Sequence, residues 1–141
     1  MKKFFTHDLP IGIVLVLVVV IVLTFGVTET SGRSMEPTFK DGDLLLVNFR
    51  VTPKDGDVLI LDTADMEGWE NSSTQIVKRY SAKDSTDGYY VLGDNAEHSY
   101  DSRYCGEIDK ERLIGVAVCN LSKDNILDIL EAIITGIFSF K

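Results

Sequence analysis

The chain has 141 residues, of which 45% are hydrophobic, and it carries a formal net charge of −8. This length fits one compact domain with a short additional segment, and it is too short for two typical domains. The negative charge and the lack of a Lys/Arg cluster argue against nucleic acid as a partner, because a phosphate backbone attracts basic surfaces.

The first segment of the chain is strongly apolar. Residues 9–27 contain no charged side chain, and the stretch from Ile11 to Leu23 is almost entirely Val, Ile and Leu. At ~1.5 Å per residue, a helix of this length just spans a hydrocarbon core of about 30 Å. We therefore predict a transmembrane anchor over residues 9–27. The alternative is a cleavable signal peptide, for which Thr24 and Gly26 form a small-x-small site.

Charges beside this segment predict its orientation. Lys2 and Lys3 precede the apolar run, and the acidic Glu29 follows it. By the positive-inside rule, residues 1–8 are expected in the cytoplasm and residues 28–122 outside the plasma membrane. The expected location is thus a single-pass protein of the plasma membrane, with membrane lipid as a partner.

The middle of the chain has the pattern of short β-strands. Turn sequences rich in Gly and Asp separate the apolar runs, which is typical of a coiled sheet or a small barrel. We therefore predict a mainly β catalytic domain over residues 28–122, and an exposed polar loop over residues 62–74 that includes Trp69. The predicted strands cover residues 44–49, 58–61, 75–80, 89–92 and 113–121.

The C-terminal segment predicts an amphipathic helix over residues 123–141. Apolar residues dominate it, while Asp124, Asp128 and Glu131 recur at the spacing of one helical face. Packing against the domain or the anchor is the expected role of this helix.

Cysteine and histidine usage predicts neither a metal site nor a disulfide scaffold. Cys105 and Cys119 are either one disulfide or two buried thiols. His7 and His98 do not form a zinc-ligand spacing with them.

A serine and a lysine in the β-rich region form a candidate catalytic pair. A serine hydroxyl needs a base, and a lysine can serve only as the neutral amine. Burial lowers a lysine pKa because desolvation penalises the ammonium form. Lys78 follows Ile76 and Val77 on a predicted strand, so an apolar environment is expected for its amine.

Four sequence boxes occur in a specific order behind the apolar segment. They are Ser-Met-Glu-Pro-Thr at 34–38, the Gly-Asp turns at 42–43 and 56–57, Lys-Arg at 78–79, and Gly-Asp-Asn with Ser-Tyr-Asp-Ser-Arg at 93–95 and 99–103. In this order, over residues 8–118, the chain resembles type I signal peptidases, which are membrane-anchored Ser-Lys serine proteases.

The resemblance implies a role for each matching residue. Ser34 would be the nucleophile, with its backbone N–H as an oxyanion donor, and Lys78 would be the general base. Ser99 would hold the Lys78 amine, while Asp101 and Arg103 would form a supporting ion pair. The second oxyanion donor of some relatives has no counterpart, because the matching position is a glycine. The expected substrate pockets for small residues are lined by Met35, Ile76 and Val77.

The implied activity is removal of signal peptides from exported preproteins after an Ala-x-Ala-like sequence. No cofactor or metal is expected. The alternatives are a dedicated processing protease for one exported substrate and a catalytically silent β-domain tethered to a membrane.

Two chemical rivals share some of these residues. Self-cleaving repressors resemble the chain in Ser-Met-x-Pro, the Gly-Asp turns and a downstream lysine, but they lack an anchor and the Ser-x-Asp-Ser-Arg box. A Ser-His-Asp triad of Ser34, His98 and Asp101 is the other rival, although in histidine-using relatives of the signal peptidases the histidine stands at the position of Lys78.

Overall fold

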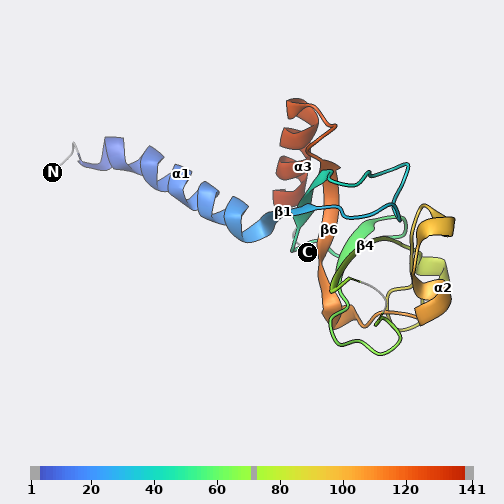
Figure 1. Cartoon of the computed structure of the whole chain (residues 1–141). Helices are drawn as coiled ribbons and strands as arrows, with labels where there is room; N and C mark the ends of the chain where they lie inside the picture. Colours follow the sequence, from blue (N-terminus) through green and yellow to red (C-terminus); the bar gives the residue numbers. More distant parts are fainter. Residues whose placement is uncertain (1–3, 71–72, 139–141) are drawn as a thin grey trace.

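The computed structural model describes residues 4–70 and 73–138, so the ends of the predicted segments 1–8 and 123–141 and part of the loop 62–74 lie outside the described residues. Figure 1 shows a β-sheet domain from which one long helix projects. The helices and strands are α1 (Phe4–Thr24), β1 (Phe25–Glu29), β2 (Leu44–Asn48), β3 (Val58–Asp62), β4 (Gln75–Tyr80), β5 (Val91–Leu92), α2 (Ser102–Cys105), β6 (Leu113–Asn120) and α3 (Ile126–Phe138), with short 3₁₀ turns at Ala82–Asp84, Ala96–His98 and Lys110–Arg112.

All described strands belong to one antiparallel sheet in the order β1-β2-β6-β3-β4-β5. The register shifts where β6 pairs with β2 and again where it pairs with β3, and such irregularities increase strand twist. The mainly β prediction is confirmed in its strand content. The domain is an open twisted sheet whose edge strands are β1 and β5, and all five predicted strands are found with small changes at their ends.

Aliphatic and aromatic side chains from β3 to β6 form the hydrophobic core. The buried members of the cluster are Leu59, Leu61, Trp69, Ile76, Tyr89, Val91, Ile108 and Val116. Trp69 is only 1% exposed, so the prediction that it lies in an exposed loop is wrong. The neighbours of Trp69 in the sequence are polar, but its ring folds back onto the sheet. It meets Tyr100 edge to face, with the two ring centroids 6.3 Å apart.

Helix α1 ends earlier than the predicted membrane segment. Phe25–Glu29 is strand β1 and pairs with β2, so the last three residues of the predicted 9–27 span are not helical. The uncharged helical part, residues 9–24, is about 24 Å long at ~1.5 Å per residue, against about 30 Å for a bilayer core. Among the described residues, no helix is both long and apolar enough to cross a membrane. The predicted N-terminal transmembrane helix is therefore wrong.

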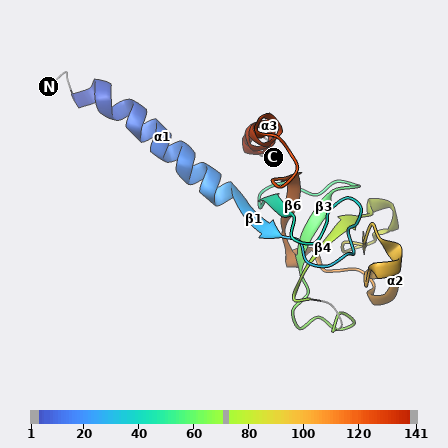
Figure 2. The ribbon, with the colours of Figure 1, turned by 45° about the horizontal axis from the view of Figure 1, so that its top comes forward.

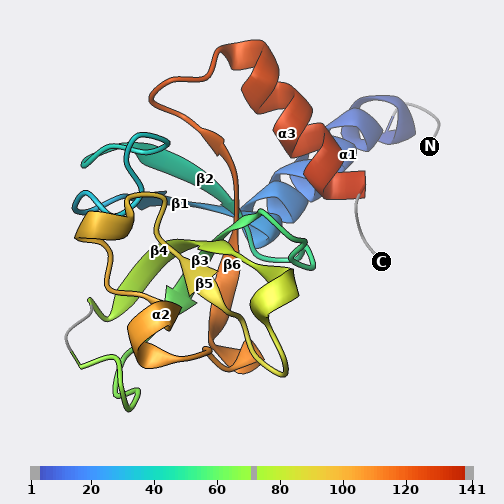
Figure 3. The ribbon, with the colours of Figure 1, turned by 90° about the vertical axis from the view of Figure 1, so that its right-hand side faces the viewer.

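Helix α1 projects from the domain with much of its apolar surface exposed (Figure 2). Helix α3, at the position of the predicted C-terminal helix, packs against β6 and beside the base of α1 (Figure 3). The approach is close at Gly136, where an added Cβ would lie 2.6 Å from the Phe25 ring and 2.8 Å from Asn48 Nδ2. Cys105 and Cys119 are both free thiols.

Candidate active site

Ser34 lies in the turn that follows β1, where the chain reverses toward β2. This nucleophile turn, residues 34–40, is closed by a hydrogen bond from Phe39 N to Met35 O at 2.9 Å. The Ser34 carbonyl accepts from Asn95 N at 2.9 Å, which joins the turn to the Gly-Asp-Asn segment after β5. Ser34 is half-buried, so its hydroxyl is supported on one side and accessible on the other.

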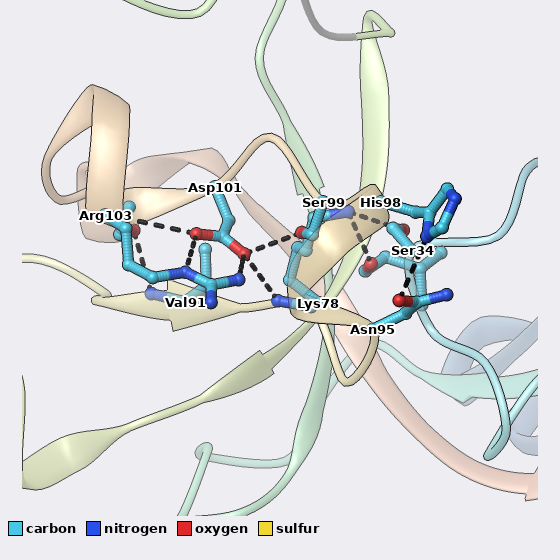
Figure 4. A network of polar contacts seen from close by, with 11 residues as sticks. Ser34, Lys78, Val91, Asn95, His98, Ser99, Asp101 and Arg103 are labelled. Carbon is cyan, nitrogen blue, oxygen red and sulfur yellow. Dashed lines mark hydrogen bonds and ion pairs between the residues drawn. The ribbon is translucent and has the colours of Figure 1, made fainter.

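Lys78 reaches Ser34 from strand β4. Its Nζ donates to Ser34 Oγ at 2.8 Å and makes a longer contact with the Val77 carbonyl at 3.3 Å (Figure 4). Lys78 is only 5% exposed. Since β4 pairs with β3 along its whole length, the sheet fixes the position of the amine. The two residues are thus within proton-transfer distance.

The environment of Lys78 favours its neutral form. Burial lowers its pKa to about 8, and the attraction of the Asp101 carboxylate opposes this shift. An amine with this pKa is substantially neutral in mildly alkaline solution, whereas an ordinary lysine is not. The pair can therefore activate a hydroxyl without a third titrating group.

Asp101 organises the buried side of the pair. Its carboxylate is fully buried and accepts from Gly93 N at 2.8 Å, from Ser99 Oγ at 2.6 Å and from Arg103 Nε at 2.8 Å. Burial raises the pKa of Asp101, but the donors, chiefly Arg103, outweigh this effect and lower the pKa to about 2. Asp101 is also the N-cap of α2, accepting from Arg103 N, so the Asp101–Arg103 ion pair sits at a helix start.

Ser99 lies between Asp101 and the catalytic pair. Its hydroxyl donates to Asp101, and among the described residues no hydrogen bond joins it to Lys78. The close packing here depends on Gly93, where an added Cβ would lie 2.1 Å from Ser99 Oγ and 2.6 Å from the Ser34 carbonyl. The expected contact between Ser99 and the Lys78 amine is thus absent among the described residues, and Ser99 binds the Asp101 carboxylate instead.

A second acid–arginine pair supports the nucleophile turn, and the sequence analysis did not find it. Arg79 binds Asp94 through two hydrogen bonds, from Nε at 2.7 Å and from the terminal nitrogen at 2.6 Å. Thr38 Oγ1 donates to the same carboxylate at 2.5 Å. Arg79 follows Lys78 in the chain, so one contact network ties the base strand to the nucleophile turn. The Gly-Asp box at 93–94 was the available signal for Asp94.

A cleft of about 240 Å³ adjoins the catalytic pair. The three residues expected to line the substrate pockets, Met35, Ile76 and Val77, all contact it, and the first two are buried. The cleft lies between the segment from β1 to Ser34 and the edge of β4. On that side β4 pairs with β5 only at its last two residues, so Gln75–Lys78 presents backbone groups to the cleft.

His98 does not form the alternative triad. Its Nδ1 lies 3.2 Å from Asn95 Oδ1, on the opposite side of Ser99 from Asp101 in Figure 4. The Asp101 carboxylate is bound instead by Gly93, Ser99 and Arg103. The geometry therefore brings Ser34 together with Lys78, and it separates His98 from Asp101.

One oxyanion donor is available at the nucleophile. Among the described residues no acceptor bonds the Ser34 backbone N–H, whereas the Gly32 N–H is bound to Asp41 Oδ1 at 2.7 Å. Gly32 has no side-chain hydroxyl to offer. Across residues 4–70 and 73–138, no group of three His, Cys, Asp or Glu side chains is arranged to hold a metal ion.

Comparisons with known proteins agree with this geometry. A family model described as Peptidase S24-like matches residues 24–118, about two thirds of the chain. No curated protein matches the sequence. The family includes Ser-Lys peptidases of both the self-cleaving repressor type and the signal-peptidase type, so the match does not choose between them. The chain therefore belongs to the Peptidase S24-like family and is a serine peptidase-like hydrolase domain with a Ser-Lys dyad.

Proposed function

We propose that this chain is an endopeptidase that removes signal peptides from exported preproteins, cutting after small residues. The observation that carries the proposal is the cleft that leads to Ser34 and Lys78 along the part of β4 that β5 does not pair. An extended peptide bound there would add a strand to the edge of β4, as in other cases of β-strand addition.

The lining of the cleft favours apolar substrate residues. Met35 and Ile76, both buried, close its apolar part. No described segment of the chain itself fills the cleft. This favours cleavage of a separate polypeptide over self-cleavage, which needs a segment of the same chain at Ser34.

The proposed reaction begins when neutral Lys78 takes the proton of Ser34 Oγ across the 2.8 Å contact. The oxygen attacks the substrate carbonyl, whose developing negative charge the Ser34 N–H stabilises. Lys78 then returns the proton to the leaving amine as the peptide bond breaks. Water hydrolyses the resulting acyl-enzyme, with Lys78 again as the base.

Exported precursors emerge at the outer surface of the plasma membrane, so the proposal locates the enzyme there, with lipid as its neighbour. The exposed apolar side chains of α1 support this location, because large apolar patches mark surfaces that contact lipid or another protein. A dedicated protease for one exported substrate would use the same site.

The test is cleavage of an exported precursor bearing an Ala-x-Ala site by the purified chain. We expect cleavage at that site by the wild type and none by Ser34→Ala. Ser85→Ala, a serine outside the cleft, is the matched control and should cleave normally. Intact mass spectrometry of the chain incubated alone tests for self-cleavage. Self-cleavage without precursor cleavage would contradict the proposal.

A further inference from the structure

The segment between β6 and α3 contacts the nucleophile turn, although it lies outside the residues that match the family. Figure 3 shows this orange link near the blue-green loop that joins β1 and β2. Leu121 N donates to Leu44 O at 2.7 Å, and Leu44 N donates to Ser122 Oγ at 2.9 Å. These bonds fix the link against the start of β2.

Lys123 extends from this link to two groups of the neighbouring loop. Its Nζ lies 2.7 Å from Asp43 Oδ2 and donates to the Thr38 carbonyl at 3.1 Å. The Lys123 side chain is 40% exposed, so it lies over the surface of the loop and is not part of the core. One amine thus connects the C-terminal segment with both the nucleophile turn and the Gly-Asp turn behind it.

Asp43 is the anion that holds this amine. Its carboxylate also accepts from Lys40 N and from Asn120 Nδ2, each at 2.9 Å. The hydrogen bond from Lys123 is the largest cause that lowers the pKa of Asp43 to about 2. The carboxylate is therefore ionised at every pH at which a lysine base is neutral.

Thr38 is held from two sides. Its carbonyl accepts from Lys123, while its hydroxyl donates to Asp94, which Arg79 binds beside the base strand. Thr38 is four residues after Ser34, in the same turn. Loss of either contact would leave Thr38 bound on one side alone, and small displacements of a nucleophile cost large factors in rate.

We propose that Lys123 is a positioning residue, which fixes the nucleophile turn so that Ser34 Oγ meets Lys78 Nζ. The inference rests on the peptidase function proposed above. On this proposal, the segment between β6 and α3 contributes to catalysis by holding the nucleophile turn in place.

The expected effect is on turnover. Lys123→Met removes both contacts but leaves the cleft residues in place, so we expect kcat to fall about tenfold with little change in KM. Lys123→Arg keeps the charge and the donors, and it should restore most of the lost kcat. Lys83→Met, an exposed lysine outside the site, should behave as the wild type.

The experiment combines steady-state cleavage of the Ala-x-Ala precursor with amide hydrogen exchange of the full chain. In Lys123→Met we expect faster exchange at Phe39, Lys40 and Asp43, which Lys123→Arg and Lys83→Met do not show. Wild-type kcat in Lys123→Met, or a loss that Lys123→Arg fails to rescue, would overturn the inference. If the wild type cleaves no precursor, the proposed function fails, and exchange alone then decides whether Lys123 holds the turn.

Discussion

The two members of the catalytic pair are held in place by different kinds of structure. Lys78 belongs to a paired strand, is 5% exposed and lies beside the buried Asp101 network. Ser34 belongs to a turn that is held by the bond from Asn95 N to the Ser34 carbonyl and by polar contacts at Thr38 near the surface. Burial thus sets the chemistry of the base, while surface hydrogen bonds set the position of the nucleophile. Substitutions on the base side should change stability and pH dependence, and those on the nucleophile side should change turnover.

Lys78→Met should show the largest effect, with opposite signs for activity and stability. Loss of the base should lower kcat/KM by about a thousandfold or more. The free energy of unfolding at pH 7 should rise by about 1–3 kcal/mol, because the variant no longer buries an ammonium whose pKa is lowered from 10.5 to about 8. Urea unfolding and precursor cleavage measure the two quantities.

The gain in the free energy of unfolding of Lys78→Met should depend on pH. Below about pH 8 the lysine is charged in both the folded and the unfolded chain, and the folded state carries the full desolvation cost. Between about pH 8 and 10.5 the folded state releases its proton first, so the gain should shrink. A gain that grows over this range would show that Lys78 is not buried as an ammonium.

Asp101→Asn should be the most destabilising change near the site. The carboxylate is fully buried while its partner Arg103 is 35% exposed, so weakening its hydrogen bonds should cost about 1.5–3 kcal/mol. The lowered pKa of Asp101 means that its contribution is present above about pH 4 and is lost as the pH falls toward about 2. Urea titrations at pH 7 and pH 3 should therefore differ less in the variant than in the wild type, and equal pH sensitivity would contradict this role.

Arg79→Met tests the nucleophile side. We expect about a tenfold loss of kcat, because Thr38 loses the support of a fixed Asp94. The free energy of unfolding should change by less than about 1 kcal/mol, since the pair is partly exposed. The exposed Arg50→Met is the matched control. A large loss of stability with unchanged kcat would show that Arg79 stabilises the fold and does not position the nucleophile turn.

Ser99→Ala should have the smallest effect, about a threefold loss of kcat/KM. Asp101 loses one of its donors but retains Gly93 and Arg103, and the 2.8 Å contact between Lys78 and Ser34 does not pass through Ser99. Cleavage kinetics measure the loss. A decrease as large as that of Lys78→Met would show that Ser99 contacts the amine directly during the reaction.

Local sequence patterns predicted much of the sheet, and the sequence boxes named Ser34 and Lys78, which lie 2.8 Å apart in the structure. Alternating apolar runs and Gly-Asp turns locate β2 to β6, because strand period and turn chemistry are short-range properties. The end of α1 was missed for a physical reason. Phe25, Gly26 and Val27 suit an apolar helix as well as a strand, and pairing with β2 decides between them.

Contacts between distant parts of the chain were not predictable in the same way. Thr38 and Asp94 are 56 residues apart, and Lys123 and Thr38 are 85 apart. Each of these residues has an ordinary local role as a turn or surface residue. Likewise, the polar neighbours of Trp69 gave no sign that its ring lies in the core. These contacts form only when the chain folds into the twisted sheet.

The pH dependence of kcat/KM tests the central claim, that Lys78 is the buried base of Ser34, most directly. Lys78 acts as the neutral amine, so activity should be present above its pKa and lost below it. We predict that kcat/KM rises about tenfold per pH unit up to about pH 8 and then levels off, both in the wild type and in His98→Gln. An acidic limb that disappears in His98→Gln would assign the base to histidine and contradict the account.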